Sequence, residues 1–357
     1  MNEIKKIAFV IPSLSPGGME RVMSEIINYI ANSTNIEIHL ITLVKEEFFY
    51  NIEKNVYVHQ PTFSFNNEGF RFFNIIRTGY FLRQKLKAIK PYSVLSFGET
   101  YNSFVILVAY GIKTKIYISD RSKPDKDWGY LHNHLRKILY KKATGIISQT
   151  SYSKNFLLKE TKNKNIKVIP NPIDLKKYQI SLNKENVVLY VGRLISSKRI
   201  DILLECFSKL ENKNWELWII GDGPLRNDLE NRAKKLGVSD NVKFWGIQYN
   251  IAPFYSKAKI FAFTFFSEGF PNALLEAIAS GLPTIAFDCI AGPSDFIQNK
   301  VNGFLVTLGD IDTFFQKLDE LIKNETLRKK FSENAIKIAK DYDIEKIGKQ
   351  YLNFLLT

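Results

Sequence analysis

Short apolar runs alternate with longer amphipathic stretches along nearly the whole chain, which has 357 residues. The runs have the length of buried strands, and the stretches have helical spacing, for example over residues 20–31 and 72–89. This alternation predicts repeated strand–helix–strand units, and therefore an α/β fold with mainly parallel sheets covered by helices on both faces. The predicted strands are residues 6–11, 36–44, 94–97, 115–119, 145–148, 187–191, 215–220, 242–245, 259–265 and 283–287.

The alternation breaks at Pro170 and Pro172, and a polar stretch follows as far as Asn186. Two prolines so close together stop regular structure, so they mark a boundary between two domains. We expect a first domain at residues 1–170, a linker at 171–186, a second domain at 187–339 and a final helix at 340–357. Each domain is long enough to bury a core of its own. Open α/β sheets bind ligands at the carboxyl ends of their strands.

Two glutamates, Glu268 and Glu276, enclose seven residues directly after the apolar run 260–266. Proline is tolerated in the first turn of a helix, so a helix is expected to begin just after the first glutamate. Glu268 should then end a strand, and Glu276 should lie about one and a half turns into the helix. The amino end of such a helix favours an anion such as a phosphate. The residues that open the segment are Gly269, Phe270, Pro271 and Asn272.

Two bases, Arg193 and Lys198, follow the predicted strand 187–191. Arginine can hold two phosphate oxygens at once, whereas lysine acts as a point charge. Fixed cations of this kind stabilise a departing diphosphate more in the transition state than in the ground state. Taken alone, the pair is read more simply as two surface bases; beside Glu268 and Glu276 it favours phosphate binding.

Glycines mark two further strand-to-helix connections. Gly17 and Gly18 precede Glu20 after the first strand, and they let backbone N–H groups approach a ligand. The spacing is not that of the dinucleotide-binding fingerprint. Gly221 and Gly223 form the second connection, which serves equally well as a purely structural turn.

Together these segments resemble the retaining, nucleotide-sugar-dependent glycosyltransferases of family 4. The resemblance covers the whole chain and includes an E-x7-E segment at 268–276, a Gly-Arg-x4-Lys segment at 192–198 and a Gly-Gly-x-Glu loop at 17–20. It implies the GT-B fold, in which two Rossmann-like domains face each other across a cleft. It also implies that the C-terminal helix, within residues 340–357, crosses back to the first domain.

The resemblance implies roles for these residues as well. Arg193 and Lys198 would hold the donor diphosphate, Glu276 the ribose hydroxyls, and Glu268 the sugar, with the backbone of residues 269–271 nearby. The loop of Gly17, Gly18 and Glu20 would lie near the diphosphate and the acceptor. The turn of Gly221 and Gly223 would form part of the nucleotide-binding wall.

Many relatives carry a histidine after the strand that corresponds to residues 115–119, but here Asp120 and Arg121 follow it. Asp120 is therefore a catalytic candidate that could accept a hydrogen bond from the acceptor hydroxyl, and Arg121 a substrate-binding one. Alternatively, the two simply pair with each other. No metal and no cofactor are expected, because the Asp-x-Asp pairs at 125–127 and 310–312 precede helices and are typical of caps.

The net charge is +14, and bases are interleaved with apolar residues at 71–90 and 136–142. Such helices suit an anionic membrane surface, although two ordinary solvated helices would have the same pattern. No nucleic-acid motif is present, and no apolar run approaches the length that spans a bilayer. Neither a secretory signal nor a cysteine pairing pattern is seen, since Cys206 and Cys289 lie in apolar stretches.

These observations predict a cytoplasmic enzyme, peripheral on the inner face of the cytoplasmic membrane. It would move a hexose or N-acetylhexosamine from a nucleotide sugar, with retention and without a metal, to a polyprenyl-diphosphate-linked saccharide or another glycan. A bacterial polysaccharide or lipopolysaccharide pathway would fit. The segment 289–295 resembles one found in transferases that use UDP-sugars. The alternatives are a GT-B nucleotide-sugar epimerase or hydrolase, and a non-catalytic nucleotide-sugar-binding subunit.

Overall fold

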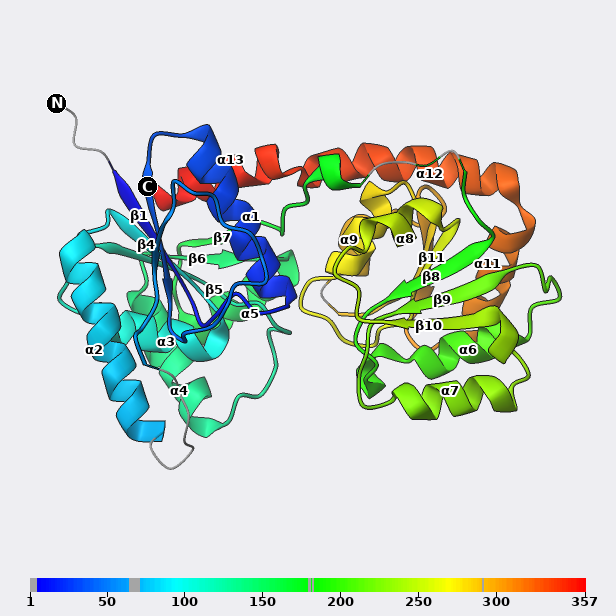
Figure 1. Ribbon diagram of the computed structural model, residues 1–357, viewed down its shortest axis with the longest axis horizontal. Helices are drawn as coiled ribbons and strands as arrows, with labels where there is room; N and C mark the ends of the chain where they lie inside the picture. The colour runs from blue at the N-terminus through cyan, green and yellow to red at the C-terminus, as the bar shows by residue number, and fades with distance from the viewer. Residues whose placement is uncertain (1–4, 64–70, 179–180, 182, 291) are drawn as a thin grey trace. The chain divides into compact units, whose positions relative to one another are not determined.

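The computed structural model describes residues 5–63, 71–178, 181, 183–290 and 292–357. The chain divides into two compact units (Figure 1). Unit 1 comprises Met1–Pro172 together with Ile344–Thr357, and unit 2 comprises Ile173–Asp343. Ile173 is fully buried in the core of unit 2, so the chain already belongs to this unit directly after Pro172.

Unit 1 is built on a seven-stranded sheet in the order β3-β2-β1-β4-β5-β6-β7. Every pairing in this sheet is parallel, as the strand–helix alternation predicts. The strands are β1 (Lys6–Ile11), β2 (Glu37–Thr42), β3 (Tyr57–His59), β4 (Ser93–Phe97), β5 (Lys115–Ser119), β6 (Gly145–Ser148) and β7 (Ile166–Val168).

Helices cover both faces of this sheet, because successive side chains of a strand point to opposite sides. On β1, Ile7, Phe9 and Ile11 enter one core, whereas Ala8 and Val10 enter the other. Helices α1 (Gly18–Ser33) and α13 (Ile344–Leu355) pack on the first face. The second face carries α2 (Arg71–Ile89), α3 (Glu99–Val108), α4 (Tyr130–Leu139) and α5 (Ser151–Thr161).

The C-terminal helix α13 packs on α1 within unit 1, which confirms the expected return of this helix to the first domain. The Tyr29 hydroxyl donates a hydrogen bond to the Glu345 carbonyl oxygen at 3.2 Å. At Gly348 the helix approaches so closely that a Cβ atom would collide with the Tyr29 ring. The helix begins at Ile344, and residues 340–343 remain in unit 2.

Unit 2 contains a six-stranded parallel sheet in the order β10-β9-β8-β11-β12-β13. The strands are β8 (Val187–Val191), β9 (Glu216–Ile220), β10 (Val242–Gly246), β11 (Ile260–Phe263), β12 (Thr284–Asp288) and β13 (Gly303–Thr307). The helices are α6 (Ile200–Ser208), α7 (Arg226–Lys235), α8 (Ala252–Lys257), α9 (Asn272–Ala279), α10 (Pro293–Phe296), α11 (Ile311–Lys323) and α12 (Glu325–Ala339).

The strand order of each sheet fixes where a ligand can bind. In unit 1, β1 lies between β2 and β4. In unit 2, β8 lies between β9 and β11. The connections that leave the carboxyl ends of these neighbours run to opposite faces of the sheet, which opens a crevice at this point. The segments after β8 and β11 are therefore the place to look for a site in unit 2.

Candidate functional site

The segments that follow β8 and β11 are joined by hydrogen bonds. The Thr264 hydroxyl donates to the Lys198 carbonyl oxygen at 2.8 Å, and the Phe266 N–H donates to the Ser197 carbonyl oxygen at 2.9 Å. These bonds explain why β11 ends at Phe263, although the apolar run predicted a strand as far as residues 265–266. The expectation that Glu268 ends a strand is wrong, because a loop separates Glu268 from β11.

The segments after β8 and β11 thus form a junction in unit 2. Lys198 lies at its centre and is only 7% exposed. It ends a short 3-10 helix, Ser196–Lys198, and its Nζ contacts the Glu268 carboxylate oxygen Oε2. The same ammonium lies 3.4 Å from the Ser267 carbonyl oxygen and 3.9 Å from the centre of the Phe265 ring. A buried charge is stable only when it is paired, so these contacts fix the Lys198 ammonium beside Glu268.

Arg193 lies two residues after β8, and its side chain is exposed. Within the described part of the chain, its guanidinium makes no hydrogen bond or ion pair. Its backbone is held, because the Ile195 N–H donates to the Arg193 carbonyl oxygen at 3.0 Å. An anchored backbone with an unoccupied guanidinium is well suited to bind an anion with two parallel hydrogen bonds.

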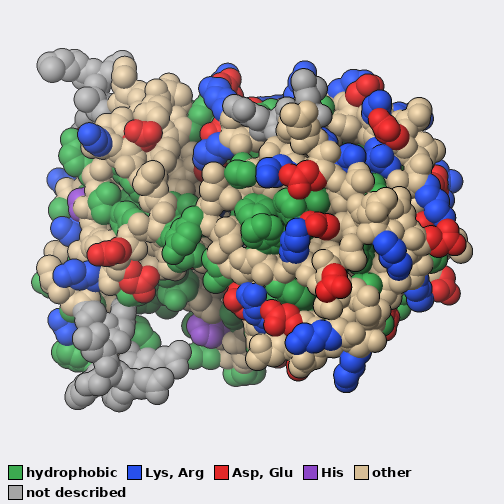
Figure 2. Space-filling view, turned by 45° about the vertical axis from the view of Figure 1, so that its right-hand side comes forward, with side chains coloured by type: hydrophobic (Ala, Val, Ile, Leu, Met, Phe, Trp, Pro, Cys, Tyr) green, Lys and Arg blue, Asp and Glu red, His purple; other side chains and the backbone are tan. Residues whose placement is uncertain are grey.

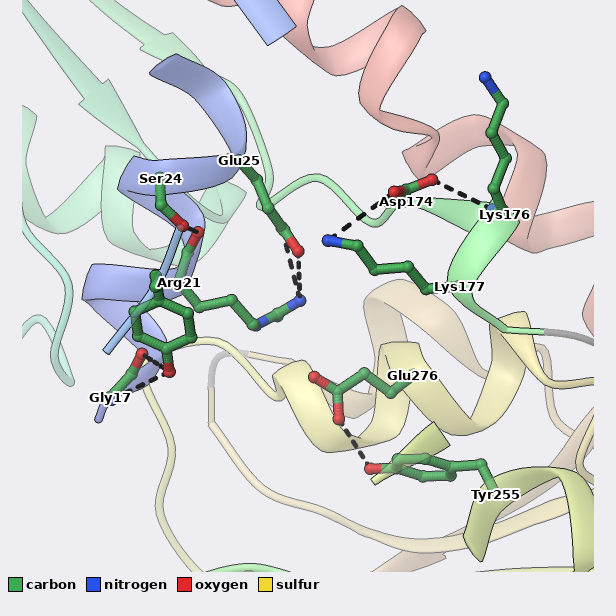
Figure 3. Close-up of polar contacts among 10 residues, drawn as sticks. Gly17, Arg21, Ser24, Glu25, Asp174, Lys176, Lys177, Tyr255 and Glu276 are labelled. Atoms are coloured by element: carbon green, nitrogen blue, oxygen red, sulfur yellow. Dashed lines mark hydrogen bonds and ion pairs between the residues drawn. The ribbon is translucent and has the colours of Figure 1, made fainter. Parts of the chain in front are cut away.

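Glu276 is 4% exposed and lies in the second turn of α9. The Tyr255 hydroxyl, from α8, lies 2.8 Å from Glu276 Oε2 and 3.1 Å from the Ala273 carbonyl oxygen (Figure 3). The phenol therefore orients the carboxylate. Sequence reasoning missed Tyr255, since no motif spacing links it to Glu276.

The residues between the two glutamates form the turn into α9. The Asn272 N–H donates to the Phe270 carbonyl oxygen at 2.9 Å, and Phe270 packs edge-on against Phe296. Gly292 has no side chain, so its backbone can lie directly against the Pro271 ring. Packing therefore fixes the backbone of residues 269–272. The expected helix is present as α9, but it begins at Asn272, so Pro271 precedes the helix instead of lying in its first turn.

The glycine turn after β9 supports the loop that carries Arg193. Gly221 has a positive φ of 126°, and a Cβ atom on it would collide with the Gly192 carbonyl oxygen. A Cβ atom on Gly223 would meet the backbone of Leu194 in the same way. Leu194 in turn donates its N–H to the Asp222 carbonyl oxygen at 3.0 Å. Gly221 and Gly223 thus allow two loops to lie backbone against backbone.

In unit 1, Gly17 lies at the amino end of α1, and Gly18 is the first residue of that helix. The Tyr50 hydroxyl accepts from the Gly17 N–H at 3.1 Å and donates to the Gly17 carbonyl oxygen at 2.9 Å (Figure 3). The Glu20 carboxylate folds back so far that a side chain at Gly17 would collide with it. Burial raises the pKa of Glu20.

Arg121 is held by partners from distant parts of unit 1. Its guanidinium donates to Asn171 Oδ1 at 2.7 Å and to the Tyr351 hydroxyl at 3.0 Å, and it lies 3.3 Å from the centre of the Phe97 ring. Glu99 accepts the Arg121 N–H at 2.7 Å. These contacts tie the loop after β5 to the C-terminal helix.

Asp120 is 4% exposed and follows β5 directly. Its Oδ1 accepts hydrogen bonds from the Tyr140 hydroxyl at 2.6 Å and from Asn102 at 3.0 Å. Burial, and then the nearby Glu99 carboxylate, raise the pKa of Asp120 to about 7. Across the described residues, Asp120 and Arg121 form no ion pair with each other, so the alternative that they simply pair is wrong.

The Asp-x-Asp pairs have ordinary structural partners. Asp310 caps α11 by accepting the Thr313 N–H at 3.0 Å, and Asp127 accepts the Gly129 N–H at 2.8 Å. Asp125 forms an ion pair with Lys123. No cluster of three or more His, Cys, Asp or Glu side chains that could hold a metal ion is found among the residues that the structure describes.

Two Rossmann-like units with these switch points define the fold of GT-B glycosyltransferases, and comparison with known proteins identifies the family. The family model for glycosyl transferases group 1 matches residues 173–338, and the model for glycosyltransferase family 4 matches residues 16–177. One relative is the Campylobacter jejuni GalNAc-alpha-(1->4)-GalNAc-alpha-(1->3)-diNAcBac-PP-undecaprenol alpha-1,4-N-acetyl-D-galactosaminyltransferase. It is 30% identical, and the match covers 98% of this chain and 98% of the relative. The chain belongs to the family of glycosyltransferases that includes this relative, which confirms the family-level resemblance seen in the sequence.

Solved structures show the same fold. The lipopolysaccharide outer core galactosyltransferase WaaB is 25% identical, with a TM-score of 0.77 and 98% of both chains covered. Anabaena HepE in complex with UDP is 18% identical, with a TM-score of 0.84 and coverage of 98% of this chain and 99% of HepE. The protein is thus a glycosyltransferase with the GT-B fold.

Proposed function

We propose that this glycosyltransferase moves a hexose or N-acetylhexosamine from a UDP-sugar to a lipid-diphosphate-linked or other glycan, with retention and without a metal ion. The observation that carries the proposal is the junction of unit 2, where Lys198 contacts Glu268 at the switch point between β8 and β11. The donor would bind there. The HepE complex with UDP supports a UDP-linked donor, and the galactosyltransferase activity of WaaB supports transfer of a hexose.

Each charged group of the junction has a role in this reaction. Arg193 would hold two oxygens of the diphosphate, and Lys198 would add a fixed charge as the bond from the sugar to the diphosphate breaks. These two cations supply the charge that a divalent metal provides in other transferases. Glu276, held by Tyr255, would accept hydrogen bonds from the ribose hydroxyls, and Glu268 from the sugar.

The unit 1 candidates have different roles in this proposal. Asp120 and Arg121 are engaged by neighbours in unit 1, which favours structural roles for both over direct contact with an acceptor. Gly17, Gly18 and Glu20 remain candidates for binding the substrate through the amino end of α1. The undecaprenol-linked acceptor of the Campylobacter relative supports a lipid-diphosphate-linked acceptor here.

An anionic membrane surface is the partner that we propose for α2. Its first turns expose Phe72, Phe73, Ile76 and Tyr80, each more than half exposed, and the protein carries a net charge of +14. Figure 2 shows that hydrophobic side chains gather in several groups on the visible face, among intermixed bases and acids. Among the described helices, none is long and apolar enough to cross a bilayer. Peripheral binding through exposed aromatic side chains and bases fits these observations.

Vesicle sedimentation tests the membrane partner. The double variant Phe72→Ser, Phe73→Ser should bind vesicles that contain phosphatidylglycerol at least about fivefold more weakly, because each exposed aromatic side chain loses its apolar contact with the lipid. The matched control is Val301→Ser, Leu308→Ser in unit 2. Equal vesicle binding by the wild type and the α2 variant would remove α2 from the membrane contact.

The function itself is tested by release of free UDP from a panel of UDP-sugars in EDTA, with and without a lipid-diphosphate saccharide. Release from one donor that rises with the acceptor supports a metal-independent transferase, and NMR of the new anomeric bond decides between retention and inversion. UDP release that does not change when the acceptor is added would favour an epimerase or hydrolase. No UDP release from any donor would favour a binding subunit. Glu276→Ala is expected to abolish transfer.

A further inference from the structure

A cavity in unit 1 lies at the edge of its sheet where the strands begin, opposite the carboxyl ends of those strands. It has a volume of about 700 Å³ and opens among the residues that precede β1, β4 and β5. Its lining includes five lysines and no acidic side chain. These lysines are Lys5, Lys6, Lys90, Lys113 and Lys115.

Part of this charge is offset within the protein. Lys6 forms an ion pair with Glu37 at 3.0 Å, and Lys115 donates to the Thr357 carbonyl oxygen at 2.6 Å and to the Tyr92 hydroxyl at 2.7 Å. Lys90 and Lys113 are exposed, and their ammonium groups make no hydrogen bond or ion pair within the described ranges. Several like charges around one hollow repel one another unless an anion occupies it.

Tyr92 lies in the middle of the lysines. The ammonium groups of Lys5 and Lys115 lie 4.7 and 4.5 Å from the centre of its ring. The hydrogen bond from Lys115 lowers the pKa of the Tyr92 phenol, which reflects the positive field in the cavity. The Tyr92 hydroxyl is itself engaged within the protein, since it accepts from Lys115 at 2.7 Å and donates to the Leu356 carbonyl oxygen at 2.9 Å.

Helix ends do not account for this arrangement. Lysines near the carboxyl end of a helix offset its dipole, and Lys90 directly follows α2. Lys5 and Lys6, however, open β1, while Lys113 and Lys115 open β5. Strands carry only small net dipoles, so the dipole of α2 explains at most one of the five lysines.

We propose that this cavity binds a phosphate-bearing ligand, either a lipid phosphate headgroup or a soluble phosphate or diphosphate. The ammonium groups would contact the phosphate oxygens. The proposal is independent of the donor site in unit 2, because it uses residues of unit 1 alone.

Lysine acetylation read by mass spectrometry tests this site residue by residue. Inorganic pyrophosphate at about ten times its dissociation constant should slow acetylation of Lys90 and Lys113 about tenfold, since mass action leaves about a tenth of the sites free. Lys234 and Lys235, exposed on α7, are the internal controls and should not change. A second arm replaces pyrophosphate with vesicles of phosphatidic acid, with phosphatidylcholine vesicles as the reference.

The outcomes distinguish a soluble phosphate ligand from a lipid headgroup. Protection by pyrophosphate identifies a soluble ligand, and protection by phosphatidic acid alone identifies a lipid headgroup. Lys90→Gln, Lys113→Gln should abolish the protection of Lys5 and Lys115, whereas Lys234→Gln, Lys235→Gln should leave it intact. If neither probe slows acetylation of the cavity lysines more than that of the control lysines, the proposal is overturned.

Discussion

The two units place their charged side chains differently at the carboxyl edges of two similar sheets. In unit 2, Lys198 contacts Glu268 in a loop, and the guanidinium of Arg193 is exposed beside them. In unit 1, Asp120 and Arg121 occupy a comparable position after a strand, but their partners are buried neighbours of the same unit. A charged residue after a parallel strand is therefore not by itself a site.

The guanidinium groups of Arg121 and Arg193 differ in the number of partners that the fold already provides. Asn171, Tyr351 and the Phe97 ring surround the Arg121 guanidinium, so binding a substrate there would require breaking contacts. Arg193 has no contact of this kind among the described residues. We therefore propose substrate chemistry for the charged residues of unit 2 and a scaffolding role for the Asp120–Arg121 segment.

The largest expected effect is on turnover and comes from Lys198→Met. Removing a fixed cation that acts on the developing charge should lower kcat about 10²- to 10³-fold, by analogy with the loss of one oxyanion-stabilising donor. Steady-state release of UDP in the presence of the acceptor measures it. Lys234→Met is the matched control and should match the wild type; a Lys198 variant with normal kcat would contradict the assignment.

Arg121→Leu and Arg193→Leu test the comparison directly. Arg121→Leu should lower the free energy of unfolding by about 2–4 kcal/mol, because Tyr351 and Asn171 lose a charged donor. Arg193→Leu should change stability by less than about 0.5 kcal/mol, since the side chain is exposed.

Chemical denaturation gives both stabilities, and transfer per folded molecule gives both activities. Arg193→Leu should lose activity about 10²-fold at unchanged stability, as expected for loss of one stabilising charge. The reverse pattern, a destabilised Arg193 variant and an inactive but stable Arg121 variant, would exchange the roles of the two units.

A smaller effect is expected from Tyr255→Phe, which removes the hydroxyl that orients Glu276. One neutral hydrogen bond contributes about 1 kcal/mol, so the KM for the donor should rise several-fold with little change in kcat. Tyr152→Phe, on the exposed face of α5 in unit 1, is the control for a lost phenol. An unchanged KM would mean that Glu276 is held without Tyr255 or does not contact the donor.

A further expected effect concerns the pH dependence of stability. The pKa of Asp120 is raised to about 7, so between pH 4 and pH 7 the folded state binds a proton at this carboxyl that the unfolded state has lost. The stability contributed by protonated Asp120 is therefore present at low pH and is lost as the pH rises toward 7.

Urea unfolding at several pH values measures this contribution. The free energy of unfolding of the wild type, relative to that of Asp120→Asn, should fall between pH 4 and pH 7, because asparagine does not titrate. Asp312→Asn on the exposed start of α11 is the control. Parallel pH profiles for wild type and Asp120→Asn would show that Asp120 titrates normally.

Much of the fold could be predicted from the sequence, because parallel strands buried on both faces leave long apolar runs. The three-residue edge strands β3 and β7 were missed, since they are short and partly exposed, and the buried edge strand β13 was missed as well. The end of β11 was placed too late, because Thr264 and Phe266 remain buried or nearly so while bonding to a loop. The burial of a residue does not show whether it hydrogen-bonds to a neighbouring strand or to a loop.

The site was predictable where its residues lie close together in sequence, as between Glu268 and Glu276. It was not predictable where the contacts are distant. Arg121 and Tyr351 are 230 positions apart, and only the packing of α13 on unit 1 brings them together. Tyr255 reaches Glu276 through the position of α8 in the fold, which no local pattern encodes.

A crystal structure of the protein with UDP would show directly whether the donor binds at the proposed residues of unit 2. We expect the diphosphate within hydrogen-bond distance of both Arg193 and Lys198, and the ribose hydroxyls at Glu276. UDP bound elsewhere, with Lys198 still paired to Glu268 and Arg193 free, would contradict this expectation.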